Sequence, residues 1–399
     1  MHQKRLRNLK QLLGQQMSDS SIIGGGPVGL IFAILNHSHT KKIHIFEAKK
    51  KDFFNQDTRA LALSNGSRVI LEEIGVWDRL KNNITRIKKI HTSQVGVFGR
   101  TLMEAGEFNE ESLGYIVSYG DLIQALKDMI ESLSNVRISF DTRVTKCVDK
   151  EGKLNLSLQT ENKIQKFQSE FVILADGATD KIEGLELNKK TKQFDHSAIV
   201  TKVLTEFPHK NVAYERFAPE GPIALLPNKK DKFSLVWTGP SKYIDELEKL
   251  SDKSFLNHLH GSFGDRVGNF IECDSRATFI LKQTYVEVLH SNIVALGNAS
   301  QTMHPVAGQG LNTGIRDAYK LNKSLIESTH TKTLITLLDE YKHSRASERK
   351  KILNFTEMLV KGFSSDLIGL KRARGYALSL LDITKPIKKS FVRKMSYGE

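Results

Sequence analysis

Three glycines in the spacing Gly24-x-Gly26-x-x-Gly29 follow a short apolar segment near the start of the chain. In such a motif, the first glycine permits a tight strand-to-helix turn, the second lets backbone approach a pyrophosphate, and the third allows close helix–strand packing. Glu47, at the end of a second expected strand, could accept hydrogen bonds from ribose hydroxyls. These residues predict a dinucleotide site, and the motif alone fits FAD and NAD equally well.

Two later segments could serve the same ligand. Asp176 and Gly177 directly follow an apolar strand, where an Asp-Gly pair is either an ordinary turn or part of a binding site. Residues 296–314 contain Pro305 and several glycines, carry no Asp, Glu, Lys or Arg, and lead directly into an expected helix. The free amides and positive dipole end of that helix could stabilise the negative charge of a reduced flavin.

The elements expected to position these residues form an α/β pattern. A strand–helix–strand unit covers residues 20–47, and the apolar segments 171–175 and 292–296 are typical of strands buried in a parallel sheet. Strand-like segments from 198 to 237 predict an antiparallel sheet. Apolar spacing also predicts helices over residues 61–80, from about residue 311, and over residues 334–363.

The composition narrows the class of protein. The 399 residues are 39% hydrophobic and 26% charged, which is typical of a globular protein. The net charge is +14, but no basic run is interleaved with aromatic residues and no zinc-finger spacing occurs, so we expect no nucleic-acid partner and no bound metal.

The two ends of the chain are basic. Residues 1–16 precede an apolar stretch, residues 22–35, that is shorter than the roughly 20 residues of a spanning helix and contains glycines and a proline, so we expect no signal peptide. We interpret residues 1–16 as a small extension, and a mitochondrial transit peptide stays open as an alternative, although the segment is short for one. The segment from 385 to 394 holds five Lys and Arg residues. It fits either a solvated tail or docking on an anionic membrane surface.

The chain resembles the FAD-dependent ubiquinone-biosynthesis hydroxylases of the UbiH/VisC group, within the wider para-hydroxybenzoate-hydroxylase class. The resemblance extends from about residue 20 to the C-terminus. It is carried by Gly24–Leu30, Asp57–Ser64, Glu73–Trp77, Asp176-Gly177, Tyr214–Phe217, Gly221–Pro227, Gly297–Ala299, His304–Asn312 and Arg316-Asp317. Within the group, Ser234–Trp237 and Ser262–Gly264 are most similar to 2-polyprenyl-6-methoxyphenol hydroxylases.

The resemblance implies a fold and a domain organisation. We expect an α/β protein whose Rossmann-like FAD-binding domain, of the para-hydroxybenzoate-hydroxylase type, is interleaved with an antiparallel-sheet substrate domain and followed by C-terminal helices. The expected parts are a basic extension (1–17), three FAD-binding parts (18–90, 121–185 and 286–325), substrate-domain strands (91–120), the main substrate domain (186–285), and C-terminal helices with a basic tail (326–399).

The resemblance also implies roles for single residues. Gly24, Gly26, Gly29 and Glu47 would hold the ADP half of FAD, with Arg59 near the flavin or pyrophosphate, Asp176 and Gly177 near the pyrophosphate, and Asn298 at the ribityl chain. Pro305, Ala307, Gly308, Gly310, Leu311 and Asn312 would line the isoalloxazine. His304 is interpreted as shaping the flavin site with Pro305 rather than acting as a general base. No catalytic side chain is assigned, because the flavin carries the chemistry.

The implied reaction is hydroxylation of the aromatic ring of a polyprenylated phenol, through a flavin C4a-hydroperoxide formed with O2. Electrons would come from NADPH, NADH or another reductant. We expect a cytoplasmic protein, with possible peripheral contact at the inner membrane surface and with other quinone-biosynthesis proteins. Two alternatives stay open: a sister hydroxylase acting at a different ring carbon, and a non-catalytic flavin-binding subunit of a quinone-assembly complex.

Two departures from the wider class bear on these roles. Asp180 and Glu183 stand where the class has Ser and Arg, which puts conventional nicotinamide docking in doubt. Asn298 stands where the class has Asp, and an amide still hydrogen-bonds a hydroxyl.

Overall fold

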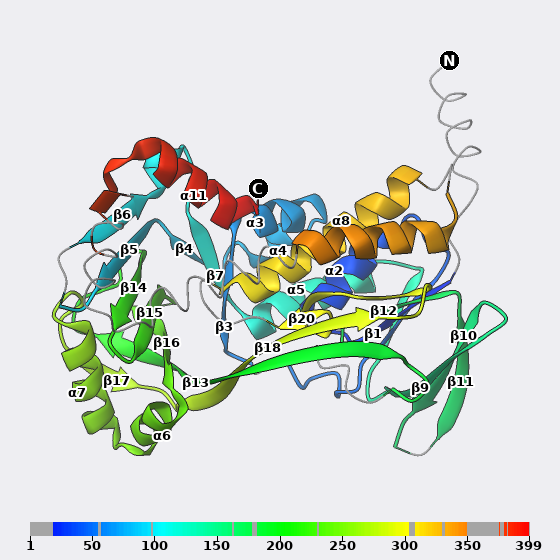
Figure 1. Cartoon of the computed structure of the whole chain (residues 1–399), viewed down its shortest axis with the longest axis horizontal. Coiled ribbons are helices and arrows are strands. Elements are labelled where there is room, and N and C mark those ends of the chain that lie inside the picture. The colour runs from blue at the N-terminus through cyan, green and yellow to red at the C-terminus, as the bar shows by residue number, and fades with distance from the viewer. Residues whose placement is uncertain are drawn as a thin grey trace.

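The described part of the chain is an α/β structure built on one parallel sheet, one large mixed sheet and two small sheets (Figure 1). The computed structural model describes residues 19–54, 57–96, 99–161, 163–177, 182–229, 231–302, 308–328, 332–348, 375, 379–380 and 382–398. The N-terminal extension and the loop residues His304, Pro305 and Ala307 lie outside the described residues.

A five-stranded parallel sheet forms the centre of the predicted FAD-binding part. Its order is β19-β12-β1-β2-β8, and all neighbouring strands run parallel. The strands are β1 (Ser20–Ile23), β2 (Ile43–Phe46), β8 (Val136–Ser139), β12 (Phe171–Leu174) and β19 (Ile293–Ala295). Because the carboxyl ends of parallel strands meet at one edge, the loops after β1, β2, β12 and β19 are neighbours there.

The two faces of this sheet are covered differently. Helices α2 (Pro27–Asn36), α5 (Tyr119–Glu131) and α8 (Gln309–Ser328) share one hydrophobic core with Ile22 and Ile173 of the sheet. On the other face, Leu174 packs with Leu156 of a small antiparallel sheet. That sheet consists of β9 (Arg143–Lys150), β10 (Lys153–Gln159) and β11 (Ile164–Ser169).

The large sheet corresponds to the predicted antiparallel sheet, and every strand pair in it except β14–β5 is antiparallel. Its order is β20-β18-β13-β16-β15-β14-β5-β6, with β17 beside β13. Its strands are β5 (Lys89–Gln94), β6 (Arg100–Glu104), β13 (Leu187–Thr205), β14 (Val212–Ala218), β15 (Gly221–Pro227), β16 (Lys232–Pro240), β17 (Phe270–Cys273), β18 (Ala277–Val288) and β20 (Gln301–Thr302). Helices α6 (Ser241–Lys249) and α7 (Asp252–Phe263) lie at one face, where Trp237 and Phe255 are fully buried (Figure 1).

A small sheet, β3 (Ala60–Leu63), β7 (Gly114–Ser118) and β4 (Thr85–Ile87), lies between these two parts. The predicted helix over residues 61–80 is wrong at its start, because Ala60–Leu63 pairs as a strand with β7. Only α3 (Asn65–Glu73) and α4 (Trp77–Leu80) are helical in that range.

The C-terminal basic segment is helix α11 (Lys385–Tyr397), which lies beside α3 (Figure 1). A fully solvated tail is therefore wrong for these residues. Lys388 and Val392 are buried, Lys388 Nζ lies 2.8 Å from Glu107 Oε2, and Tyr397 donates to Glu110 Oε1 at 2.8 Å.

The helix predicted over residues 334–363 is confirmed only in part. Residues 334–348 are helical, and the remainder of the predicted 334–363 helix lies outside the described residues. Within the described ranges, no helix is both long enough and apolar enough to cross a membrane.

Candidate functional site

The first predicted segment forms the turn between β1 and α2, and two of its glycines cannot be replaced without a clash. Gly24 has φ of 109°, and a methyl group there would lie 2.5 Å from backbone atoms of Ala175 and Asp176. A methyl group on Gly29 would lie 2.3 Å from the carbonyl oxygen of Gly24. The close approach to Ala175 and Asp176 also shows that the first and second segments are in contact.

The start of α2 offers backbone donors to an anion. Gly26 is the N-cap residue, and no described side chain caps the helix. Pro27 has no N–H group, so the amides of Val28 and Gly29 are the first-turn donors, at the positive end of the helix dipole. The structure thus supplies the environment that a pyrophosphate requires.

Glu47 closes the other side of this turn. Its Oε2 accepts a hydrogen bond from the Gly25 amide at 2.7 Å, and its Oε1 accepts from the Lys49 amide at 2.8 Å. The buried carboxylate is thereby held in one orientation at the end of β2. Each oxygen retains a lone pair for a ribose hydroxyl.

Arg59 contacts Tyr119, whose hydroxyl lies near Gly26 of the first segment. The sequence did not indicate a role for Tyr119. The Arg59 guanidinium lies 4.9 Å from the centre of the Tyr119 ring and 2.5 Å from Asp57. The Tyr119 hydroxyl would lie 3.6 Å from a methyl group on Gly26. Burial raises the pKa of Tyr119 to about 12, so its hydroxyl keeps its proton and can donate.

The pKa of the Asp57 carboxyl is lowered below its usual value. Burial alone would raise it, but the hydrogen bonds and the charge of Arg59 outweigh that effect. Asp57 is therefore ionised and holds the guanidinium beside the Tyr119 ring.

The third segment meets the other two. A methyl group on Gly177 would lie 4.0 Å from Cβ of Asn298, and one on Gly297 would lie 3.0 Å from a methyl group of Val28 in α2. The structure therefore gathers Gly24, Gly26, Gly29, Glu47, Asp176, Gly177 and Asn298 at the same edge of the parallel sheet.

Asn312, in the first turns of α8, fastens the third segment to β3. Its Oδ1 accepts from the Ser64 amide at 2.8 Å and from Ser67 Oγ at 2.7 Å. Its Nδ2 donates to the carbonyl oxygens of Ala62 and Gly308, both at 2.8 Å. Its side chain thus positions the start of α8, where Gly308, Gly310 and Leu311 also lie. No local sequence signal could have paired Asn312 with residues about 250 positions away.

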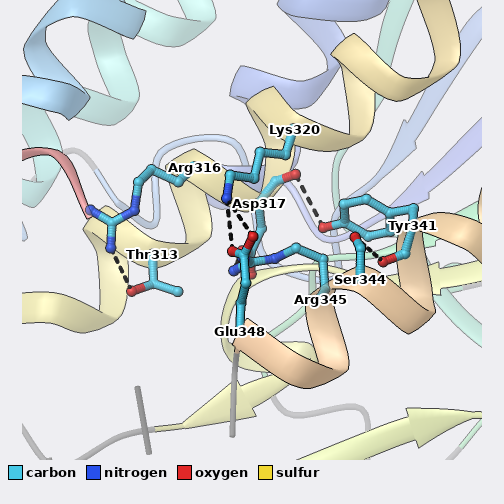
Figure 2. A network of polar contacts seen from close by, with 8 residues as sticks. All are labelled: Thr313, Arg316, Asp317, Lys320, Tyr341, Ser344, Arg345 and Glu348. Atoms are coloured by element: carbon cyan, nitrogen blue, oxygen red, sulfur yellow. Dashed lines mark hydrogen bonds and ion pairs between the residues drawn. The ribbon is translucent and has the colours of Figure 1, made fainter. Parts of the chain in front are cut away.

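A buried ion pair anchors α8 from its other side (Figure 2). Asp317 of α8 and Arg345 of the helix over residues 334–348 are paired, and their side chains are only 2% and 3% exposed. Glu348 accepts from Arg345 and from Lys320 Nζ, the latter at 2.7 Å, and Tyr341 donates to the Asp317 carbonyl at 3.1 Å. The Arg316-Asp317 motif therefore includes a structural anchor for the helix that begins at the site.

At the position where the sequence departs from the wider class, the structure shows an ion pair. Glu183 Oε1 lies 2.5 Å from Lys146 Nζ on β9, so its carboxylate is engaged in an ion pair. Asp180 lies outside the described residues.

Comparison with known proteins matches residues 17–356 to the FAD binding domain family. The chain belongs to that family. This FAD-binding chain is 27% identical to the ubiquinone hydroxylase UbiL of Rhodospirillum rubrum, over 95% of the chain and 89% of the relative. It is 25% identical to the human mitochondrial ubiquinone biosynthesis monooxygenase, over 94% of the chain and 91% of the relative.

The solved structure of p-nitrophenol 4-monooxygenase PnpA from Pseudomonas putida superposes with a TM-score of 0.77 at 15% identity, covering 96% of this chain and 98% of that one. The predicted fold, a Rossmann-like domain of the para-hydroxybenzoate-hydroxylase type with an interleaved sheet, is confirmed. The matches also confirm the UbiH/VisC resemblance and the prediction of an FAD-dependent aromatic monooxygenase.

The described residues fit FAD on structural grounds. Close contacts exclude a side chain at Gly24 and Gly29, so the backbone beside the uncapped amides of α2 stays free for a ligand. The Glu47 carboxylate is fixed where a ribose would lie. A second helix begins at Gln309, within the third segment, and can place its positive end against the flavin.

Proposed function

We propose that this chain hydroxylates the aromatic ring of a polyprenylated phenol in ubiquinone biosynthesis, in the manner of the 2-polyprenyl-6-methoxyphenol hydroxylases. The observation that carries the proposal is the match, over nearly the whole chain, to relatives named as ubiquinone hydroxylases or ubiquinone biosynthesis monooxygenases. The motifs Ser234–Trp237, in β16 of the large sheet, and Ser262–Gly264, at the end of α7, support the more specific assignment.

In this proposal, each of the three segments binds a different part of FAD. Amides at Gly26 and the start of α2 bind the pyrophosphate with Asp176 and Gly177 nearby, Glu47 accepts from the ribose, and Asn298 binds the ribityl chain. Arg59, held by Asp57 and Tyr119, adds positive charge near the flavin or pyrophosphate.

The remaining predicted residues, His304, Pro305, Ala307, Gly308, Gly310, Leu311 and Asn312, surround or position the isoalloxazine. When bound and reduced, FAD supplies with O2 the electrophilic oxygen atom that the reaction needs. The protein binds and orients the phenol and excludes water.

The proposed electron donor is NADPH, NADH or another reductant, and its docking route differs from that of the wider class. The presence of Glu183 where the wider class has Arg supports a different route, because a carboxylate cannot bind a phosphate as a guanidinium does.

We also propose that the start of α11 and the residues just before it contact an anionic membrane surface, from which the lipid substrate is taken. Leu380, Ile383 and Ile387 are 60%, 79% and 52% exposed, and the exposed Lys385 and Lys389 lie beside them. Apolar side chains flanked by lysines are typical of interfacial helices. Flotation with anionic and neutral vesicles tests this contact, and equal binding of the wild type and an Ile383→Ser/Ile387→Ser variant would contradict it.

Deletion of the gene followed by lipid analysis tests the substrate. The proposal predicts that ubiquinone is lost and that a polyprenylated precursor lacking one ring hydroxyl accumulates. A precursor lacking a different hydroxyl indicates the sister hydroxylase, and unchanged ubiquinone contradicts the proposal.

Complementation separates the enzyme from a non-catalytic flavin-binding subunit. A Gly29→Val chain, in which the side chain would occupy the space of the Gly24 carbonyl, should not bind FAD and should not restore ubiquinone. Restoration by a folded, flavin-free variant would favour the non-catalytic reading.

A further inference from the structure

Glu215 lies in the middle of β14, and the neighbouring residues show which way it faces. Arg216 Nε donates to the Ser262 carbonyl of α7 at 3.1 Å, and the Tyr214 ring lies 5.6 Å from that of Phe263 in the same helix. Since successive side chains of a strand point to opposite faces, Glu215 points away from α7, to the same face as Ala213.

That face meets β3, which contacts the start of α8 (residues 308–312, called here the flavin segment). Ala213 and Leu226 pack in one hydrophobic cluster with Ala62 of β3. The Ala62 carbonyl accepts from Asn312, and the Ala62 methyl would lie 3.0 Å from a methyl group on Gly308. Glu215 is thus two residues along β14 from the contact between the large sheet and the strand that adjoins the start of α8.

The carboxylate of Glu215 has no partner among the described residues, although protein surrounds it on the sheet side. Its register neighbours are Thr92 on β5 and Ala224 on β15, both short and uncharged. Part of its surface remains accessible. A sheltered carboxylate without a hydrogen-bond donor or a cation is costly in a folded protein, and such groups concentrate at functional sites.

Few charged groups face Glu215 from the packed elements. On its face of the sheet, β5 presents Ile90, Thr92 and Gln94, β6 presents Thr101 and Met103, β15 presents Pro222, Ala224 and Leu226, and β16 presents Ser234, Val236 and Thr238. Lys202 on β13 is the nearest charged residue of this face within the described register, three strands away. From the opposite side, β3 presents Ala60 and Ala62.

We propose that Glu215 is a catalytic residue that accepts the phenolic proton of the substrate during ring hydroxylation. This inference rests on the proposed function, because the proton acceptor requires a phenol bound between the large sheet and the flavin segment. It names the group that activates the ring, which the motifs leave unassigned.

The proton transfer balances without a further reagent. The phenolic O–H bond breaks, its proton goes to a carboxylate oxygen of Glu215, and the electron pair stays on the phenolate oxygen, which makes the ring more electron-rich. Reduced FAD and O2 supply the oxygen atom. The ring hydrogen leaves as a proton to water, and Glu215 returns its proton to the product phenolate.

The acidity of Glu215 suits this task. Burial raises the pKa of its carboxyl from 4.5 to about 7. With a phenol near pKa ~10, the change makes proton transfer to the carboxylate roughly 300-fold more favourable than it would be for an ordinary glutamate. A base whose pKa is close to the operating pH is also the most effective at neutral pH.

Single-turnover hydroxylation by the FAD-loaded chain tests the proposal, with a short-prenyl methoxyphenol as the probe. Glu215→Gln keeps the size of the side chain but cannot take the proton, and we expect its hydroxylation rate to fall about 10²–10⁴-fold. Glu272→Gln, which removes a carboxylate from the exposed side of β17 in the same sheet, is the matched control and should keep its rate. The wild-type rate should fall as pH decreases through about 7, and Glu215→Gln should lose that dependence.

A Glu215→Gln rate within about threefold of the wild type, with the same pH profile, would overturn the proposal. Ultraviolet difference spectra of the bound phenol provide a readout that needs no turnover. Because the ionised Glu215 carboxylate disfavours a second negative charge beside it, the bound probe should ionise at a higher pH in the wild type than in Glu215→Gln, whereas identical ionisation in both would overturn the proposal. If the wild type binds and ionises the probe but hydroxylates no polyprenylated phenol, the proposed substrate is wrong while the role of Glu215 stands.

Discussion

The ion pair of Asp317 with Arg345 gives a quantitative test of how α8 is held against the rest of the site (Figure 2). Replacing Arg345 with Met keeps an unbranched, flexible side chain but removes the cation that pairs with the buried Asp317 carboxylate. Removing one partner of a buried pair costs about 3–5 kcal/mol. Because whole domains are stable by about 5–15 kcal/mol, we expect Arg345→Met to lower the free energy of unfolding by about a fifth or more.

The double variant Asp317→Leu/Arg345→Met should be much closer to the wild type than the sum of the single changes. Apolar residues of similar volume replace both charges, and such replacements are often neutral. We therefore expect a coupling energy of at least about 2 kcal/mol from the double-mutant cycle. The control is Lys320→Met, which breaks a half-exposed ion pair with Glu348 and should cost under about 1 kcal/mol.

Urea unfolding of the FAD-loaded chain, followed by circular dichroism at pH 5 and pH 8, measures these values. In Arg345→Met, the charge that favours the ionised form of the buried Asp317 carboxyl is lost, so the cost of the substitution should be smaller at pH 5 and grow as pH rises. A loss below about 1 kcal/mol, or additive single effects, would refute the reasoning that this pair anchors α8.

Three further changes probe other parts of the account. Gly29→Ala should abolish FAD binding, because its methyl group would lie 2.3 Å from the Gly24 carbonyl oxygen, while Gly106→Ala, which has open space around it, should leave the flavin spectrum unchanged. Asn312→Ala should cost about 2–4 kcal/mol of unfolding free energy in urea, because the Ser64 amide loses its partner; a cost below 1 kcal/mol would be inconsistent with the observed bonds. Burial raises the pKa of Glu215 in the folded chain to about 7, so its contribution to the free energy of unfolding is lost as pH rises from about 4.5 through 7. The free energy of unfolding of the wild type should therefore fall by at most about 2.5 kcal/mol between pH 5 and pH 8, and Glu215→Gln should show no such fall.

The parallel sheet and the ligand-binding edge could be predicted from the sequence because their signals are local. Gly24, Gly26 and Gly29 follow a buried strand and precede a helix, and the short apolar segments before Asp176 and Asn298 are buried strands of the same sheet. Each needs only its own few residues to be recognised.

Other features depend on partners that are distant in the sequence. Ala60–Leu63 has helical apolar spacing but forms a strand because β7 offers it a partner. Tyr119 reaches Gly26, and Asn312 reaches Ser64, only in the folded chain. Burial of Lys388 likewise depends on Glu107, which is distant in the sequence. The segment rich in lysine and arginine, for which a solvated tail was one interpretation, is therefore a helix packed on the rest of the protein.

Glu215 shows the same limit within the active site. Its sequence neighbours indicate a strand, but its orientation toward the flavin segment follows from the register of β14 with β5 and β15. The motif Tyr214–Phe217 includes Glu215, but the sequence does not show that this carboxylate has no partner within the described structure.

The FAD content of the purified, folded chain tests the central claim most directly. The flavin released on denaturation is measured by its visible absorbance and compared with the protein concentration. We expect one FAD per chain in the wild type and in Gly106→Ala, and none in Gly29→Ala. A folded wild-type chain that is colourless and takes up no FAD on incubation would contradict the convergence of the three segments on a flavin.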